Sequence, residues 1–381
     1  MRLTQDMQDY LQGSQEELKQ LIRDLCAIPA PSRHEEKRAA FCRDWFAAAG
    51  FEGVYIDEAL NVVCPYCAAE EADLVVFMAH TDTVFPDLEP MPMREDGRKM
   101  YCPGVCDDTG NLAVMMLCAR YFLRRGLRPG QGVLFVANSC EEGLGNLKGS
   151  GEIVRAFGGR IRELISFDGG SFHRIVDRAV GSHRYRVRVR TEGGHSYAAF
   201  GNRNAIRYLA SLIDTLYAVK VPEKEGCKTT YNVGLISGGT SVNTIAQQAE
   251  MLYEYRSDDR ECLEAMRRIF ESAVETYRAM GVEVEVERVG ERPCAGNVDA
   301  QAHARLIRRA EESIRAIVGR EPVRLSGSTD CNIPLSVGIP AVCLSAVTGA
   351  RMHTREEELD LDSLLEGCRL TMDFMAGYFV P

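Results

Sequence analysis

The segment LVVFMAHTD, Leu74–Asp82, places a histidine and an aspartate directly after a short and wholly apolar run. Three further runs have the same character: Val133–Ala137, Leu164–Phe167 and Ala341–Leu344. Short runs that are apolar throughout are typical of central strands in a parallel sheet whose two faces are both covered by helices. The pattern therefore predicts an α/β fold with a mainly parallel sheet and helices on both faces.

Acidic and imidazole side chains follow all four runs. In chain order they are His80 and Asp82, Glu141 and Glu142, Asp168, and, beyond a short loop, His353, while Asp107 and Asp108 lie in a separate loop, GVCDDTG. The carboxyl ends of the strands in an open α/β sheet form one edge, so these side chains are expected to converge. Left uncompensated, such a cluster would cost several kcal/mol of desolvation per ion, on the order of the buried-charge penalty. Bound divalent metal ions would compensate this negative charge. Mixed histidine and carboxylate ligands suit Zn²⁺, or Co²⁺ and Mn²⁺ as substitutes.

Spacing within the motifs separates their roles. His80 is a candidate ligand, and Asp82 lies on the same side of an extended chain, where it can orient the far ring nitrogen of His80. Glu141 and Glu142 point apart in extended structure, so one can bind metal while the other acts as a general base. A metal pair would polarise a carbonyl and acidify a water molecule, which is the chemistry of amide hydrolysis.

The pattern of apolar and polar residues changes between about His183 and Val289. The run RYRVRVR, Arg184–Arg190, alternates strictly, as a half-exposed strand does. Two helix-spaced stretches and further strand-like runs follow, which gives the order β-α-β-β-α-β of a compact split βαβ unit. We therefore predict a catalytic domain at residues 1–182 and 291–381, interrupted by a smaller inserted domain at residues 183–290.

Composition limits the possible functions. The 381 residues exceed one average domain, and 45 Lys and Arg against 55 Asp and Glu give a net charge of −10, which argues against a nucleic-acid partner. No run approaches the ~18 apolar residues of a membrane span, and the polar N-terminus lacks a signal core. The 14 cysteines are scattered through a core-competent chain and favour reduced thiols. We expect a cytoplasmic protein with neither a nucleic-acid nor a membrane partner.

Five motifs together resemble the dinuclear zinc exopeptidase and deacylase family, which includes peptidase T, carboxypeptidase G, acetylornithine deacetylase, succinyl-diaminopimelate desuccinylase and aminoacylase. They are HTDTVFP, GVCDDTG, NSCEEGLGN, SFDGG and ARMHTREE, and the resemblance runs from about residue 14 to 375. It implies two Zn²⁺ per subunit. The implied roles are Asp107 as the bridging ligand, His80 and Asp168 at one ion, Glu142 and His353 at the other, Glu141 as the general base, and Asp82 as the residue that orients His80.

The inserted unit is similar to the dimerisation domain of that family. Its segment GGHSYAAFGNRNAI implies that His195 reaches across a homodimer into the active site of the partner as an oxyanion donor. A second segment, SGGTSVNTIAQQAEMLYEYRS, implies that Asn243 and Arg256 bind the substrate, and that Arg256 binds the carboxylate of the substrate. A surface salt bridge is the alternative role for Arg256.

The resemblance implies hydrolysis of an amide bond in a small substrate, and a di- or tripeptide is the first choice. An N-acyl-amino-acid deacylase or a glutamate-type carboxypeptidase is the alternative, although Glu254 stands where deacylases often have Asp. Thr109 replaces a Lys and Ala246 a Pro of many relatives, and these departures bear on substrate fit because neither removes a ligand. A remote alternative is a metal-free binding protein, which predicts the loss of a ligand or of the base, and all of these residues are present.

Two other motifs suggest different chemistry. The segment Cys64–Cys67, CPYC, copies a dithiol redox motif, but such a motif acts at a helix N-terminus and this one follows strand-like residues. The segment GHSYA at 194–198 approximates a serine nucleophile elbow, but the arginine-rich run before it is not a buried strand. We expect neither redox nor serine chemistry.

Overall fold

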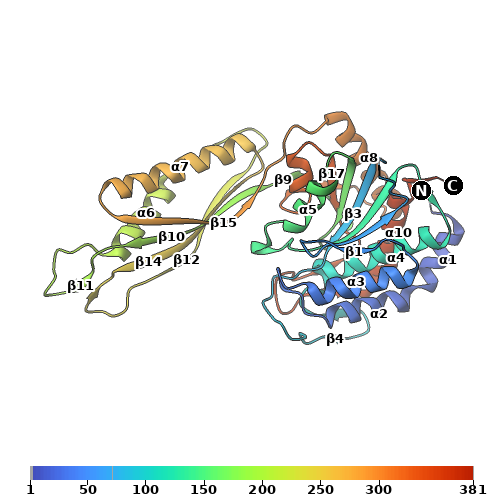
Figure 1. Ribbon diagram of the computed structural model, residues 1–381, viewed down its shortest axis with the longest axis horizontal. Coiled ribbons are helices and arrows are strands. Elements are labelled where there is room, and N and C mark those ends of the chain that lie inside the picture. The colour runs from blue at the N-terminus through green and yellow to red at the C-terminus, as the bar shows by residue number, and fades with distance from the viewer. Residues whose placement is uncertain (1–2, 71, 381) are drawn as a thin grey trace. The chain divides into compact units, whose positions relative to one another are not determined.

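The computed structural model describes residues 3–70 and 72–380, and the chain divides into two compact units (Figure 1). Unit 1 comprises the described residues up to Ala179 and from Gly296 onward, and unit 2 is Val180–Ala295. Among the described residues, no helix combines the length and the apolar character needed to cross a membrane.

Within the described residues, unit 1 is built on an eight-stranded sheet with the order β1-β2-β7-β3-β8-β17-β9-β16. Its strands are β1 (Tyr55–Ile56), β2 (Val62–Tyr66), β3 (Leu74–His80), β7 (Gly132–Asn138), β8 (Ile161–Phe167), β9 (Arg174–Ala179), β16 (Val323–Gly327) and β17 (Ala341–Leu344). The central strands β7, β3, β8 and β17 are mutually parallel, whereas β2 and β9 run antiparallel to their central neighbours. The four apolar runs form the parallel centre of the sheet, which confirms the predicted fold class.

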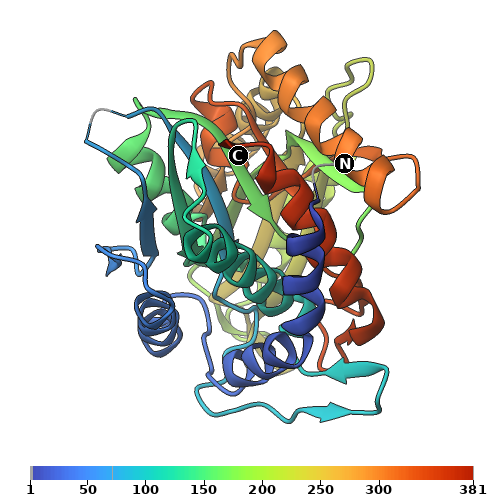
Figure 2. The same ribbon diagram turned by 90° about the vertical axis from the view of Figure 1, so that its right-hand side faces the viewer.

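Helices surround this sheet. They are α1 (Gln5–Gly13), α2 (Gln15–Cys26), α3 (Glu36–Ala49), α4 (Asn111–Arg124), α5 (Lys148–Phe157), α8 (Ala300–Ile317), α9 (Asn332–Ser336) and α10 (Leu364–Ala376). Helix α4 packs on β3, β7 and β8 and contacts α10, and the blue α1 lies beside the red α10 in Figure 2. Because every residue of β3 and β7 is buried, both faces of the sheet centre are covered.

Stacked aromatic rings hold the central strands in register. Phe77 in the middle of β3 stacks with Phe135 of β7 and Phe167 of β8, at ring-centroid distances of 5.9 and 6.3 Å. A slip of one residue would turn each ring to the opposite face of the sheet, so the register is strongly specified. This register places His80 at the carboxyl edge of the sheet, opposite Asn138 at the end of β7.

Short elements shape the loops at that edge. A small antiparallel sheet has the order β18-β19-β5-β4, and β19 pairs with β5. The loop that carries Asp107 follows β5, and His353 lies between β18 and β19. The strands of this small sheet are β4 (Arg94–Glu95), β5 (Lys99–Tyr101), β18 (Gly349–Ala350) and β19 (Glu358–Asp360), and helical turns lie at Val105–Gly110, Gly143–Gly145 and Leu361–Ser363. A separate pair, β6 (Arg128–Pro129) and β20 (Phe379–Val380), lies beside the start of β7.

Unit 2 is an antiparallel sheet with the order β12-β14-β10-β15, and helices α6 and α7 pack against it (Figure 1). Its elements are β10 (Gly181–Arg190), β11 (Gly194–His195), α6 (Ala205–Ala218), β12 (Thr229–Gly238), β13 (Thr244–Ile245), β14 (Gln248–Ser257), α7 (Arg260–Ala279) and β15 (Glu283–Arg292). Apart from the two-residue strands β11 and β13, the order is β-α-β-β-α-β, as the sequence predicts. The alternating arginines of β10 pair with glutamates of the adjacent strands, for example Arg188 with Glu250 at 2.6 Å.

Candidate metal centre

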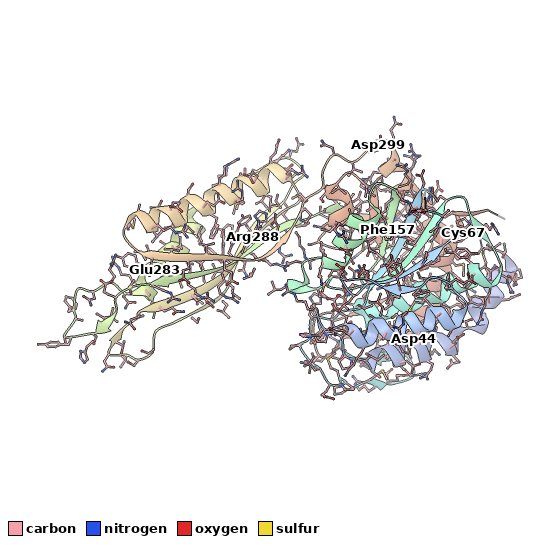
Figure 3. All side chains as sticks on the ribbon, viewed as in Figure 1. Asp44, Cys67, Phe157, Glu283, Arg288 and Asp299 are labelled. Atoms are coloured by element: carbon pink, nitrogen blue, oxygen red, sulfur yellow. The ribbon has the colours of Figure 1, made fainter. Side chains whose placement is uncertain are left out.

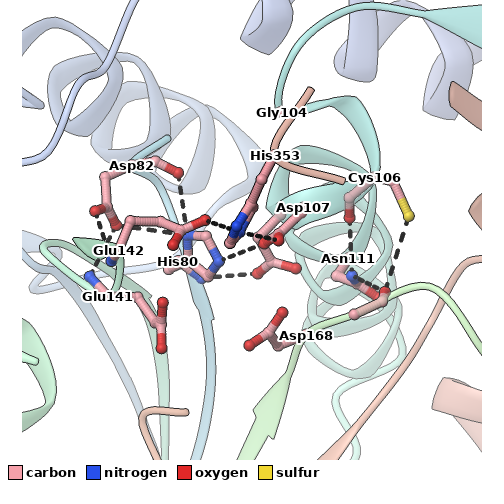
Figure 4. A network of polar contacts seen from close by, with 12 residues as sticks. His80, Asp82, Gly104, Cys106, Asp107, Asn111, Glu141, Glu142, Asp168 and His353 are labelled. Carbon is pink, nitrogen blue, oxygen red and sulfur yellow. Dashed lines mark hydrogen bonds and ion pairs between the residues drawn. The ribbon is translucent and has the colours of Figure 1, made fainter. Parts of the chain in front are cut away.

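The residues that follow the four central strands gather at one edge of the unit 1 sheet (Figure 4). His80 ends β3, the two glutamates follow β7, and Asp168 follows β8. Asp107 and His353 are brought in by the loops next to β5 and β18. The parallel sheet and the small antiparallel sheet beside it together close the separation of 273 residues between His80 and His353.

Asp107 lies between two imidazoles. Its Oδ1 is 3.0 Å from Nε2 of His80, and its Oδ2 is 3.1 Å from Nε2 of His353. The same nitrogen of His353 is 3.0 Å from Oε1 of Glu142. One carboxylate therefore has each oxygen directed to a different imidazole.

Potential metal donors form sets that overlap at this carboxylate. Within each set, one donor atom of every residue lies within 4.8 Å of the others. The sets are His80, Asp107, Asp108 and Asp168; Asp107, Glu142 and His353; and His80, Glu141 and Glu142. Two neighbouring cation sites that share one carboxylate would use the first two sets, and paired sites of this kind occur in metal-dependent hydrolases.

The electrostatics of the cluster suit cations. Burial, and then the charge of Asp107, raises the pKa of Asp168 to about 7, and burial raises the pKa of Asp108 well above its usual range. Hydrogen bonds with Asp107 and then Glu142 raise the pKa of His353 to about 11. Burial opposes protonation of His80, but the carboxylates around it, Asp108 first, raise its pKa well above the usual value. The cluster thus draws positive charge to itself, and divalent cations would supply that charge through the same donor atoms.

Asp108 adds a further donor. Its Oδ2 accepts a hydrogen bond from the backbone N–H of His80 at 2.8 Å. Its Oδ1 is buried and has no hydrogen-bond partner among the residues that the structure describes. A buried carboxylate oxygen in that state is costly unless a cation or a proton compensates it. The donor set therefore fits a metal ion, whereas the sequence alone assigns Asp108 no role.

Asp82 holds the segment that carries the two glutamates. Its Oδ1 accepts a hydrogen bond from the backbone N–H of Glu141 and its Oδ2 one from that of Glu142, both at 2.9 Å. Nδ1 of His80 is 3.1 Å from the main-chain oxygen of Asp82 and 3.4 Å from its Oδ1. Asp82 therefore faces the far ring nitrogen of His80 and also anchors the main chain of the next motif.

The sequence offers no sign of two residues that support this arrangement. Oγ of Ser32 donates to Oδ2 of Asp82 at 2.6 Å, and Oε1 of Glu35 accepts from the backbone N–H of Cys140 at 3.0 Å. Cys140 has a positive φ of 57°, so the chain needs support where it turns into the glutamate pair. The contacts span 50 and 105 residues, and no local pattern could have revealed them.

The remaining candidates lie in unit 2. His195 is exposed in β11, and Nδ1 of its ring accepts from the backbone N–H of Tyr197 at 3.3 Å. The main-chain oxygen of Asn243 accepts a hydrogen bond from Ser196 at 2.9 Å, so Asn243 is next to His195.

Arg256 is not near these two residues. Its guanidinium makes a bidentate ion pair with Glu254 at 2.9 and 3.0 Å. It lies near the end of β14, whereas β13 and its partner strand β11 precede the start of β14. The rise of an extended strand over the eight steps from Gln248 puts Arg256 roughly 25 Å from that end of the sheet.

The competing motifs occupy unsuitable places. Cys64 is buried within β2 and burial raises the pKa of its thiol, while Cys67 is exposed after the strand (Figure 3). Neither cysteine begins a helix. Ser196 follows the two-residue strand β11, not a buried strand that leads into a helix. The geometry of a dithiol motif or of a nucleophile elbow is therefore missing at these residues.

Comparison with known proteins identifies a family and several relatives to which this chain is similar. The model of the peptidase family M20/M25/M40 matches residues 76–376. Carboxypeptidase G2 from Pseudomonas sp. is 23% identical over 312 residues, which cover 80% of this chain and 74% of the relative.

Two solved structures have a similar fold. A tripeptidase from Staphylococcus aureus has a TM-score of 0.75 and 22% identity, with 94% of this chain and 97% of that chain covered. The YXEP protein of Bacillus subtilis, described as a dinuclear metal binding peptidase, has a TM-score of 0.66 and 17% identity, with 96% of this chain and 99% of that chain covered.

We expect Asp82→Asn to loosen the segment that carries Glu141 and Glu142, because an amide offers one acceptor oxygen where the carboxylate offers two. A hydrogen bond to a charged acceptor is worth about 1.5–3 kcal/mol, so the free energy of unfolding should fall by about 2 kcal/mol. Urea unfolding in chelator-treated buffer measures this loss. Asp73→Asn is the control, since Asp73 pairs with Arg162 at the surface, and an equal loss in both variants would contradict the anchoring role of Asp82.

Proposed function

The chain belongs to peptidase family M20/M25/M40 and is a hydrolase that acts on peptide bonds, and we propose that it is a dinuclear zinc peptidase that cleaves di- and tripeptides. The observation that carries the proposal is the Asp107 carboxylate, whose oxygens lie 3.0 and 3.1 Å from Nε2 of His80 and of His353. A carboxylate in this position is suited to share two cations.

We assign one ion to His80, Asp107 and Asp168, and the other to Asp107, Glu142 and His353. The mixture of imidazole and carboxylate donors suits Zn²⁺, with Co²⁺ or Mn²⁺ as substitutes. When bound, the two ions would polarise the scissile carbonyl and lower the pKa of a water molecule beside it.

Glu141 is the proposed general base. Its side chain is only 5% exposed, it shares a donor set with His80 and Glu142, and Asp82 holds its backbone N–H. It takes a proton from the attacking water and passes that proton to the leaving amine. A positioned carboxylate in this role contributes about 10²–10⁴-fold to the rate.

We propose that His195 serves the active site of a partner subunit. Arg256 is roughly 25 Å along the sheet from the His195 end of unit 2, and a tripeptide spans only about 10 Å when fully extended. His195 and Arg256 of one chain therefore do not contact the same small substrate. His195 of one subunit donates a hydrogen bond to the developing oxyanion in the other, with Asn243 beside it. Arg256 binds the substrate carboxylate, which takes the place of the Glu254 carboxylate at the guanidinium.

An exposed edge strand supports the proposed homodimer. Strand β12 is at the edge of the unit 2 sheet, and its Leu235 and Ile236 are 45% and 54% exposed. Helix α6 lies next to β12 and exposes Ile206 and Tyr217. An edge strand with unpaired main-chain groups and exposed apolar side chains is a ready template for pairing with a second chain.

A cytoplasmic location is part of the proposal. The 14 cysteines are free thiols in the structure, and most of them are buried. Free thiols persist in reducing compartments, whereas exported proteins commonly pair them.

The metal assignment predicts different effects for substitutions of the general base and of a metal ligand. We expect Glu141→Gln to lower kcat by about 10²–10⁴-fold while the zinc content of the protein stays near that of the unmodified chain. His80→Ala should instead lower the zinc content itself, and chelation should abolish turnover in the unmodified chain. Elemental analysis beside kinetics measures both, with Glu52→Gln at an exposed position as the control. Activity that survives complete removal of metal would contradict the proposal.

The substrate class is tested by mass-spectrometric detection of products from one panel. It contains free-amine di- and tripeptides, N-acetyl and N-succinyl amino acids, and glutamyl conjugates. We expect the free-amine peptides to be cleaved with the highest kcat/KM. A preference for N-blocked substrates would reassign the chain to the deacylases or glutamate-type carboxypeptidases, and no turnover with metal bound would favour a binding protein.

Mixed dimers test the role of His195. His195→Ala and Glu141→Ala should each be inactive, but in a mixed dimer the site with an intact Glu141 receives an intact His195. After equal mixing and free exchange, about a quarter of all sites should be restored in a two-fold symmetric assembly. Turnover of the mixture beside each variant alone measures this. No recovery in mixed dimers verified by native mass spectrometry would refute exchange of His195 between subunits.

A further inference from the structure

A buried carboxylate outside the proposed ligand set binds the loop that carries Asp107. Glu357 is 1% exposed, and its Oε1 accepts hydrogen bonds from the backbone N–H groups of Cys106 and Asp107 at 2.8 and 2.9 Å. Its Oε2 accepts from the backbone N–H of Gly104 at 2.8 Å. Three N–H donors of one irregular loop thus converge on a single side chain.

The loop is shaped to present these donors. Gly104 has a φ of 78°, and a Cβ added there would lie 2.5 Å from Cγ2 of Thr83. Asp107 has a φ of −112° and a ψ of 87°, which interrupts the helical turn around it. Backbone N–H groups in such a turn form a concave nest, and here the group that the nest binds is the carboxyl group of a side chain of the protein.

Glu357 is singled out from three consecutive glutamates. Glu356 is exposed, and Glu358 turns to the surface, where it pairs with Lys99 and Arg351. The backbone of Glu357 also accepts a hydrogen bond from Cys102 at 3.2 Å, and Glu358 pairs with Tyr101 across β19 and β5. The strand pairing therefore sets Glu357 directly against the loop that begins after β5.

Glu357 also lies four residues after His353 on the same segment. Its carboxylate therefore links the two loops whose side chains meet where Oδ2 of Asp107 approaches Nε2 of His353 at 3.1 Å. Without the carboxylate, three N–H groups of the loop would lose their acceptor, and the main chain of Asp107 would be free to shift. Neither residue is held against the other by regular secondary structure.

We propose that Glu357 is a positioning residue that aims the Asp107 carboxylate at both metal ions and couples it to His353. The proposal rests on the proposed dinuclear function. The three hydrogen bonds to Glu357 hold the main chain at and before Asp107, so they restrict the direction in which the Asp107 side chain leaves the loop. A shared carboxylate tolerates little error, because a shift that improves its fit to one ion worsens its fit to the other.

The test compares Glu357→Gln and Glu357→Ala with the adjacent exposed control Glu356→Gln. Binding of Zn²⁺ is measured by competition with a chromophoric chelator, and the magnetic coupling of two bound Co²⁺ ions is measured by electron paramagnetic resonance. We expect the control to match the unmodified chain. Glu357→Gln should weaken metal affinity by about 10–100-fold and reduce the coupling, since the amide keeps one acceptor oxygen. Glu357→Ala should weaken both further, and kcat should fall with KM unchanged.

Thermal unfolding in the presence of a chelator separates positioning from stability. A folded Glu357→Gln protein with unaltered metal affinity and unaltered Co²⁺ coupling would overturn the proposal, even if its melting temperature fell. If the Gln and Ala variants do not fold, Glu357→Asp, which keeps the charge on a shorter side chain, is measured in the same way. Failure of all three to fold would assign Glu357 to stability alone. If the unmodified chain does not bind two ions, the dinuclear function itself fails, which is a distinct outcome.

Discussion

The burial of several carboxylates and of the His80 imidazole at one sheet edge is the constraint on which the rest of unit 1 depends. Buried charges are tolerated only where other charges or hydrogen bonds compensate them. The pKa of Asp168 rises to about 7 and that of His353 to about 11, which shows how strongly this edge favours positive charge. The imidazoles of His80 and His353, one at each oxygen of Asp107, supply part of that positive charge. A pair of cations would satisfy the remainder through the same atoms.

Buried carboxylates also accept backbone hydrogen bonds that hold the irregular loops in place. Asp82 accepts backbone hydrogen bonds from the segment after β7, Asp108 accepts from the end of β3, and Glu357 accepts from the loop after β5. A carboxylate offers about four acceptor sites, so it can collect N–H groups that have no strand partner. The side chains at the sheet edge are therefore directed by buried acids behind them, and loops without regular secondary structure hold defined positions.

Unit 2 is stabilised differently from unit 1. One face of its antiparallel sheet packs against α6 and α7, and the other face carries charged side chains. Arg188 and its neighbours on β10 find glutamates on the adjacent strands, which makes that face a ladder of ion pairs. Such pairs add little stability individually, but they keep the face polar. Large apolar side chains are instead exposed on the edge strand β12, on α6, and in the loops next to β11 and β13, where Tyr197, Phe200 and Val242 lie.

Local patterns suffice to predict the four parallel strands, the β-α-β-β-α-β order of the inserted unit and the residues that follow each strand, because apolar periodicity and strand ends are properties of neighbouring residues. Topology then requires those strand ends to meet, so the convergence of His80 and Asp168 is also predictable. Other features depend on which distant loops pack together. The bond between Ser32 and Asp82 spans 50 residues, and nothing in the run Glu356–Glu358 distinguishes the glutamate that is buried. Only the folded chain decides these contacts, because a buried N–H takes whichever acceptor the packing brings to it.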